Sequence, residues 1–168
     1  MKRFVSCLLI LVSLLCFVGC NSTDGMKSAN FYYVRNSYIY GQEDGVMTAE
    51  VRSIEEFSSQ QDILLAYLNG PQDLSLVSPF PNGIKVYEFL FEEDTLHITL
   101  SAHIVTLSKA KQVLACACFA RTAMELTGVK EVHFQTDDTD FARMDPIVIN
   151  EDSMLLYDDY NFPTPTDP

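Results

Sequence analysis

The chain has 168 residues, with 23 acidic residues against 11 basic ones and a formal net charge of −12 at pH 7. Such a surface repels phosphate backbones, which argues against nucleic-acid binding. It also repels anionic lipid headgroups, so a folded domain of this charge is expected to stand away from a membrane surface.

The first nineteen residues have the pattern of an export signal. Lys2 and Arg3 give a positive start, residues 4–17 are apolar apart from two serines, and Gly19 directly precedes Cys20. This order is typical of a secretory signal, and the apolar run is short for a membrane-spanning helix. The Val-Gly-Cys ending resembles the bacterial lipobox, in which the cysteine receives a diacylglycerol. We therefore expect cleavage between Gly19 and Cys20 and lipidation of Cys20, with an uncleaved N-terminal anchor as the alternative.

Signal removal would leave 149 residues, which is 168 less 19 and suits one domain with a hydrophobic core. The loss of two of the 11 basic residues would leave 9 against 23 acidic ones, a formal charge of −14. The lipid would hold the chain at the extracytoplasmic face of the cell membrane. We expect a polar tether over residues 20–29, the domain over residues 30–150, and an acidic, proline-rich tail over residues 151–168.

The domain begins with two predicted strands. Residues 31–34, Phe-Tyr-Tyr-Val, are aromatic and β-branched. Residues 46–54 follow an Asp-Gly turn signal and place Arg52 between apolar Val51 and Ile54.

A helix follows, with clear signals at both ends. Ser58 is the expected N-cap, and Gln61 three residues later completes a capping box. Gly70 supplies a left-handed residue after the last turn, and Pro71 blocks continuation. The apolar face of this helix consists of Leu64, Tyr67 and Leu68.

The next segment predicts a β-hairpin, because residues 86–91 and 96–100 flank the acidic residues 92–95 as a four-residue turn. Each strand has one apolar face. These faces carry Phe89 and Phe91 on the first strand, and Leu96, Ile98 and Leu100 on the second.

A long helix is expected over residues 108–127, with Ser108 as N-cap and Gly128 as the stop. Its middle, residues 113–120, is apolar almost all round and rich in small side chains, which predicts a buried helix. Residues 130–135 then predict a strand. Residues 146–149 predict a short edge strand, since Pro146 is tolerated only at an edge or a strand start. The resulting β-β-α-β-β-α-β order indicates a single α+β domain.

Few side chains suggest chemistry. Cys116 and Cys118 would point to nearly opposite sides of the long helix, so we expect two buried free thiols and no disulfide. The three histidines, His97, His103 and His133, show no metal-ligand spacing, and a surface position is the ordinary explanation for His97 and His133.

The remaining motifs are incomplete. Asp137, Asp138 and Asp140 resemble part of a calcium loop that lacks its glycine and its final glutamate. Neither a Gly-x-Ser-x-Gly segment nor a glycine-rich phosphate loop is present. We therefore expect no catalytic residue, no metal and no cofactor. Arg52 and Arg121 stand out because basic residues are scarce; for Arg121 we expect an internal pair or a surface position, with a carboxylate partner as the alternative.

Three stretches together resemble the GerMN domain, the sporulation and spore germination module of bacterial lipoproteins. They are residues 64–71 (Leu-Leu-Ala-Tyr-Leu-Asn-Gly-Pro) with the Pro-Asn-Gly-Ile-Lys-Val turn at 81–86, the hairpin at 92–101, and residues 128–134 (Gly-Val-Lys-Glu-Val-His-Phe) after the long helix. The resemblance covers residues 31–138. It implies a compact α+β domain with two main helices on one face of a small mixed or antiparallel sheet.

The resemblance also implies a non-catalytic role in sporulation, germination or envelope assembly, through an envelope or sporulation protein partner. A partner strand could add to an exposed sheet edge, and residues 31–34 and 146–149 are the expected edges. The competing interpretations are a ligand-binding lipoprotein and a hydrolase associated with the cell wall.

Overall fold

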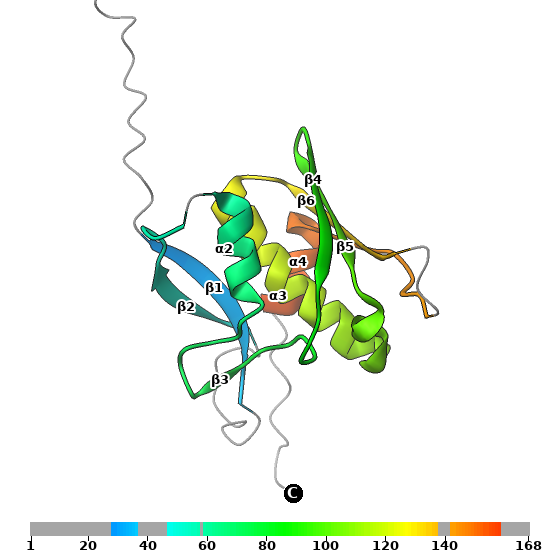
Figure 1. Ribbon diagram of the computed structural model, residues 1–168, viewed down its shortest axis with the longest axis horizontal. Helices are drawn as coiled ribbons and strands as arrows, with labels where there is room; N and C mark the ends of the chain where they lie inside the picture. The colour runs from blue at the N-terminus through cyan, green and yellow to red at the C-terminus, as the bar shows by residue number, and fades with distance from the viewer. Residues whose placement is uncertain (1–27, 37–46, 58, 138–141, 159–168) are drawn as a thin grey trace, which may run out of the picture.

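The computed structural model describes residues 28–36, 47–57, 59–137 and 142–158, with side chains up to Met154 in the last segment (Figure 1). Gly19, Cys20 and most of the predicted tether lie outside these residues. The elements in chain order are β1 Ser28–Arg35, β2 Met47–Ser53, α2 Gln60–Tyr67, β3 Leu76–Val77, β4 Val86–Glu92, β5 Thr95–Leu100, the 3-10 helix η2 Ala102–Thr106, α3 Lys109–Thr127, β6 Glu131–Thr136, β7 Ile147–Asn150 and α4 Glu151–Asp158.

The predicted α+β class is confirmed, but the strands form two sheets where one was expected. One sheet has the order β2-β1-β3 and is antiparallel. The other has the order β4-β5-β6-β7, in which only the β5–β6 pair is parallel. Helix α3 makes the connection between these two parallel strands. The helix is apolar on almost every side, and a single sheet could cover only one of its faces.

Phe119 of α3 lies at the centre of the core, with 1% of its surface exposed. Its ring contacts aromatic rings from several parts of the fold, with centroid distances of 5.0 to 6.4 Å. Edge and offset contacts of this kind stabilise a core beyond simple burial. The partner rings belong to Tyr67 of α2, Phe80, Phe89 of β4 and Phe134 of β6.

Helix α2 begins one residue later than expected. Its N-cap is Ser59, whose side chain accepts a hydrogen bond from the Asp62 backbone N–H and donates one to the Asp62 carboxylate. The predicted box of Ser58 and Gln61 is therefore wrong by one position, because consecutive serines offer two equivalent caps. Gly70 has φ 86°, which confirms the predicted left-handed residue after the helix.

Strand β1 is the middle strand of its sheet, so the prediction that residues 31–34 form an edge is wrong. Strand β3 pairs with β1 only at Val34 and Arg35. Farther back along β1, the Tyr32 N–H donates to the Thr122 side-chain oxygen at 2.9 Å, and its C=O accepts from the Tyr67 hydroxyl at 2.7 Å. Side chains of α3 and α2 thus take the place of a neighbouring strand at this point. The other expected edge is confirmed, since β7 is the last strand of its sheet.

The hairpin of β4 and β5 is tighter than predicted. Glu92 pairs with Thr95, so the turn has two residues, Glu93 and Asp94, instead of four. Glu93 adopts φ 50°, a conformation that the sequence does not signal because no glycine stands there. The pairing also shifts between Val86 and Glu88, which places a β-bulge near the start of β4.

The ordered chain continues past residue 150, where the sequence suggested the start of a tail. Helix α4 begins there with a reciprocal cap, in which Asn150 and Ser153 exchange hydrogen bonds between side chains and backbone. Met154 is only 5% exposed and belongs to the core. No helix within the described residues is long and apolar enough to cross a membrane.

Candidate functional site

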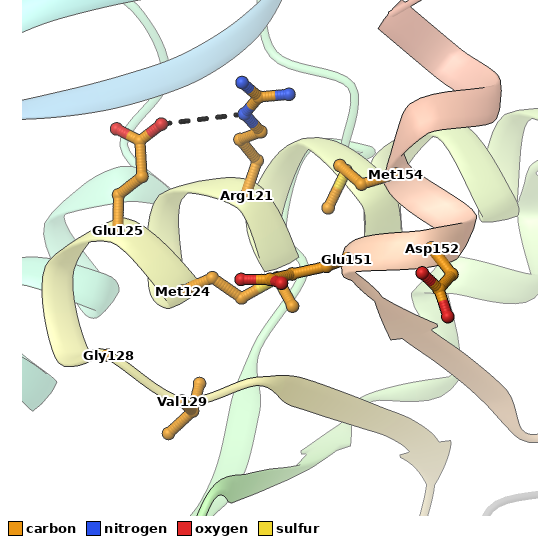
Figure 2. A pocket seen from close by; sticks show the side chains of 8 residues that line it. All are labelled: Arg121, Met124, Glu125, Gly128, Val129, Glu151, Asp152 and Met154. Atoms are coloured by element: carbon orange, nitrogen blue, oxygen red, sulfur yellow. Dashed lines mark ion pairs between the residues drawn. The ribbon is translucent and has the colours of Figure 1, made fainter.

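An open groove runs along the C-terminal half of α3 and is bounded by α4 (Figure 2). Its volume is about 580 Å³, which falls in the range of about 300–1,000 Å³ typical of small-molecule sites. The lining residues are Arg121, Met124, Glu125, Gly128, Val129, Glu151, Asp152 and Met154.

The floor of the groove is apolar and contains two methionines on facing helices. Met124 of α3 is partly buried, while Met154 of α4 and Val129 after α3 are 5% and 7% exposed. Gly128, with φ 79°, ends α3 and turns the chain so that Val129 reaches the floor. Methionine is flexible and polarizable, so this floor can adapt its shape to an occupant.

One wall of the groove is fixed by hydrogen bonds. Glu125 accepts from the Asn30 side chain at 3.0 Å and from the Tyr32 hydroxyl, and it lies 3.6 Å from the Arg121 guanidinium. The Arg121 guanidinium also lies over the Tyr32 ring, 5.0 Å from its centroid. Burial and the hydrogen bond to Glu125 raise the pKa of Tyr32. Arg121 therefore pairs within the domain, which is one of the two positions expected for it.

The opposite rim belongs to α4. Glu151 and Asp152 are exposed at the start of that helix, where carboxylates are stabilised by the helix dipole. The lining therefore contains three carboxylates and one guanidinium, a net charge of −2. Figure 2 shows Arg121 and Glu125 together on α3, with Glu151 and Asp152 on the neighbouring helix.

A second hollow, of about 210 Å³, adjoins this wall and shares Glu125 with it. It is lined by Glu125 and Leu126 of α3 and by Ser28, Ala29 and Asn30 of β1. The first described residues of the domain therefore lie beside the groove.

Comparison with known families identifies the family of this domain. Residues 30–140 match the family model described as Germane, sporulation and spore germination. The chain belongs to the Germane family. The resemblance to the GerMN domain is thereby confirmed, and with it a relation to sporulation and germination. The match ends at residue 140, so the α3 side of the groove lies within the Germane segment and the α4 side lies beyond it.

One solved structure resembles the Germane domain. It is the 2.5 Å crystal structure of a Clostridium perfringens protein described as a candidate lipoprotein, with 18% sequence identity and a TM-score of 0.42. The alignment covers 66% of this chain and 74% of the other. A search of curated proteins finds no significant match.

Two of the three histidines of this Germane domain are neighbours on paired strands. His97 of β5 and His133 of β6 are paired in register, with ring centroids 4.7 Å apart. His97 lies 3.5 Å from the Glu92 carboxylate, and His133 pairs with Glu131, whose pKa is lowered mainly by that hydrogen bond. Both rings are about one-third exposed on the sheet surface, as expected.

The other predicted residues stay apart from the groove. His103 lies in η2, beside Gly83. Asp137 is described, whereas Asp138 and Asp140 are outside the described residues. Across the described segments, no group of three or more His, Cys, Asp or Glu side chains is arranged to hold a metal ion.

Cys116 and Cys118 are free and fully buried, which confirms the expectation of two thiols. Burial raises the pKa of both, that of Cys118 to about 12. The sequence did not point to the groove itself, because Met124 and Met154 belong to no recognisable motif and residues 151–168 were expected to be a tail.

Proposed function

We propose that this protein is a membrane-tethered, non-catalytic interaction module that acts in spore formation, spore germination or envelope assembly on the extracytoplasmic side of the membrane. The family supports the biological setting. The lipobox-like residues before Cys20 support the tether. The observation that carries the proposal is the open groove on α3, with its adaptable floor and charged rim.

The carboxylates of the groove suit binding better than catalysis. Glu125 accepts hydrogen bonds on both oxygens, from Asn30 and Tyr32, so it has little capacity left to act as a base. Glu151 and Asp152 are exposed neighbours at the start of one helix, where water would screen them. A hydrolase needs an acid and a base that face each other across a bound substrate.

Crosslinking in living cells tests the proposal. A photo-reactive residue would be placed in turn at three exposed or groove positions, Val51, Leu74 and Met124, during vegetative growth and during sporulation. We expect specific capture of an identified envelope or sporulation protein from at least one position, and less capture when Cys20→Ala removes the tether. Capture of abundant neighbours alone, together with measurable affinity for a small molecule, would favour the ligand-binding interpretation.

A second assay tests the non-catalytic part. The protein is mixed with purified cell wall, and the release of soluble fragments is measured. No release above background is expected. Release that is abolished by Glu125→Gln, Glu151→Gln or Asp152→Asn would show a hydrolase and refute the proposal.

A further inference from the structure

We infer that the groove binds a basic segment of the protein partner, with a lysine or arginine side chain lying along the methionine floor and its cationic end on the α4 side, at Glu151 with Asp152 nearby in the chain. This inference rests on the proposed function and adds to it a place on the surface and a chemistry for the partner. It also assigns a role to α4.

The charge of the groove selects a cation. Three carboxylates and one guanidinium line it, and the Arg121 guanidinium is held by Glu125 and the Tyr32 ring. The whole chain carries a strong negative charge as well, which attracts a basic partner over a longer range. An acidic segment would meet repulsion both at a distance and in contact.

The two sides of the groove differ in charge, and this difference sets the orientation of a bound side chain. Glu125 is occupied by Asn30, Tyr32 and Arg121, so it is a poor site for another cation. Glu151 and Asp152 are exposed on α4, and Glu151 interacts electrostatically with Lys130, whose ammonium group is paired with Asp94. Figure 2 shows the Glu151 side chain reaching over Met124, whereas the Asp152 side chain lies on the other side of the α4 turn. A cationic head is therefore expected on the α4 side, at Glu151, away from the Arg121 charge.

The floor fits the rest of a basic side chain. Lysine and arginine carry long alkyl stems that pack on apolar surface while their charged ends stay in water. Met154 and Val129 expose only a little surface, so the apolar part of the floor is a narrow strip beside Met124. A flexible alkyl stem matches such a strip, and methionine adjusts to it.

The side of the groove that carries this chemistry lies outside the family match. Residues 30–140 match the family, whereas Glu151, Asp152 and Met154 follow that segment. The asparagine–serine cap at Asn150 and Ser153 fixes the start of α4, and Met154 packs it on the core. Partner selection by α4 would thus use residues that follow the matched segment.

Methyl NMR on the full-length chain, purified in a neutral detergent, tests the inference. The methionine methyl groups are labelled with carbon-13, so Met124 and Met154 report on the groove while Met47 and Met144 serve as internal controls. The probe is a short alanine–lysine peptide with blocked ends. We expect it to shift the Met124 and Met154 signals, with binding that weakens as salt is added.

Two further peptides separate charge from stem. Replacing lysine by glutamate should abolish the shifts. Replacing lysine by diaminobutyric acid keeps a positive charge at neutral pH and halves the alkyl stem, so binding should weaken. An equal response to all three peptides, or no shift of Met124 and Met154 with millimolar lysine peptide, would overturn the inference.

A matched pair of variants checks the rim. Glu151→Gln with Asp152→Asn removes two charges from the groove, and about tenfold weaker binding is expected. Glu55→Gln with Glu93→Gln removes two exposed charges elsewhere and should leave the affinity within about twofold at physiological salt. Equal losses in both variants would mean non-specific attraction. In cells, absence of capture at Met124 alone would refute the groove as the docking site. Absence of capture at all three positions would refute the proposed function.

Discussion

Glu50 and Arg52 stand two residues apart on β2 and form an ion pair on the inner face of the sheet, where each side chain is only 10% exposed. Arg52 also donates to the Gly70 C=O at 2.7 Å and lies over the Phe31 ring, 4.7 Å from its centroid. Glu50 accepts from the backbone N–H groups of Gln72 and Asp73. The pair thus joins β2 to the loop that follows α2.

Replacing Arg52 by alanine should therefore destabilise the domain by about 2–4 kcal/mol, because it leaves the Glu50 charge buried without its partner. Denaturant unfolding monitored by circular dichroism measures the change. The control is Val51→Thr on the same strand. Val51 points outward and is 69% exposed, so its replacement should alter the free energy of unfolding by less than about 0.5 kcal/mol. Similar effects of the two changes would contradict this account.

Thr122→Val tests whether α3 stabilises β1 by accepting a hydrogen bond on the side of β1 where no strand pairs. The substitution preserves shape but removes the oxygen that accepts from the Tyr32 N–H. Leaving this N–H without a partner costs about 1–3 kcal/mol. Hydrogen exchange should accelerate at the Tyr32 amide more than at amides of β5. Thr122→Ser retains the hydroxyl and should keep that amide protected, even if the lost methyl group lowers overall stability.

The two buried thiols predict sensitivity to alkaline pH. Burial raises the pKa of Cys116 and Cys118 above the ordinary value of 9.0, so the unfolded chain loses these protons first as pH rises. The stability that they contribute is complete below pH 9 and declines above it, by up to about 1.4 kcal/mol per pH unit for each thiol. Tyr67, whose pKa is also raised by burial, adds to the decline above pH 10.

Unfolding measured from pH 8 to pH 11 checks this sign. The double replacement of Cys116 and Cys118 by alanine should lower stability at neutral pH but flatten its fall between pH 9 and pH 10. A thiol reagent should label the native protein slowly and count both thiols after denaturation. A stability that rises with pH in this range would rule the explanation out.

Cys20→Ala tests the anchor. If Cys20 carries the lipid, the variant should leave the membrane fraction or accumulate as an unprocessed precursor, whereas Cys116→Ala should fractionate like the unaltered protein. Fractionation and the mass of the mature N-terminus give the readout. A processed Cys20→Ala protein that remains with the membrane would end the lipoprotein interpretation.

Local signals in the sequence predicted most of the fold. Local sequence was enough to predict the turn at Gly70, the ends of α3, the strands of the second sheet and the buried thiols. Each of these features depends on residues close together in the chain. The pairing of β2 was not, because its inner face carries Glu50 and Arg52 while Val51 faces water. Only the loop after α2 and the aromatic rings of β1 make that arrangement favourable.

The groove was hidden for a related reason. Its two sides come from α3 and α4, and the start of α4 is defined by a reciprocal exchange between Asn150 and Ser153, a capping box without the usual Ser/Thr and Glu/Gln residues. Composition suggested a tail there, since prolines and acidic residues dominate the end of the chain. Long-range packing of Met154 decides the outcome instead.

The bulge between Val86 and Glu88 affects how well the protein resists aggregation at high concentration. Strand β4 is an edge and exposes Tyr87, Leu90 and Phe91, a surface on which another chain could stack to start an aggregate. The bulge interrupts the regular edge, and the acidic side chains at residues 88 and 92–94 repel an approaching copy. Acidification toward the isoelectric point near 4.4 removes that repulsion, so precipitation there should begin at this edge.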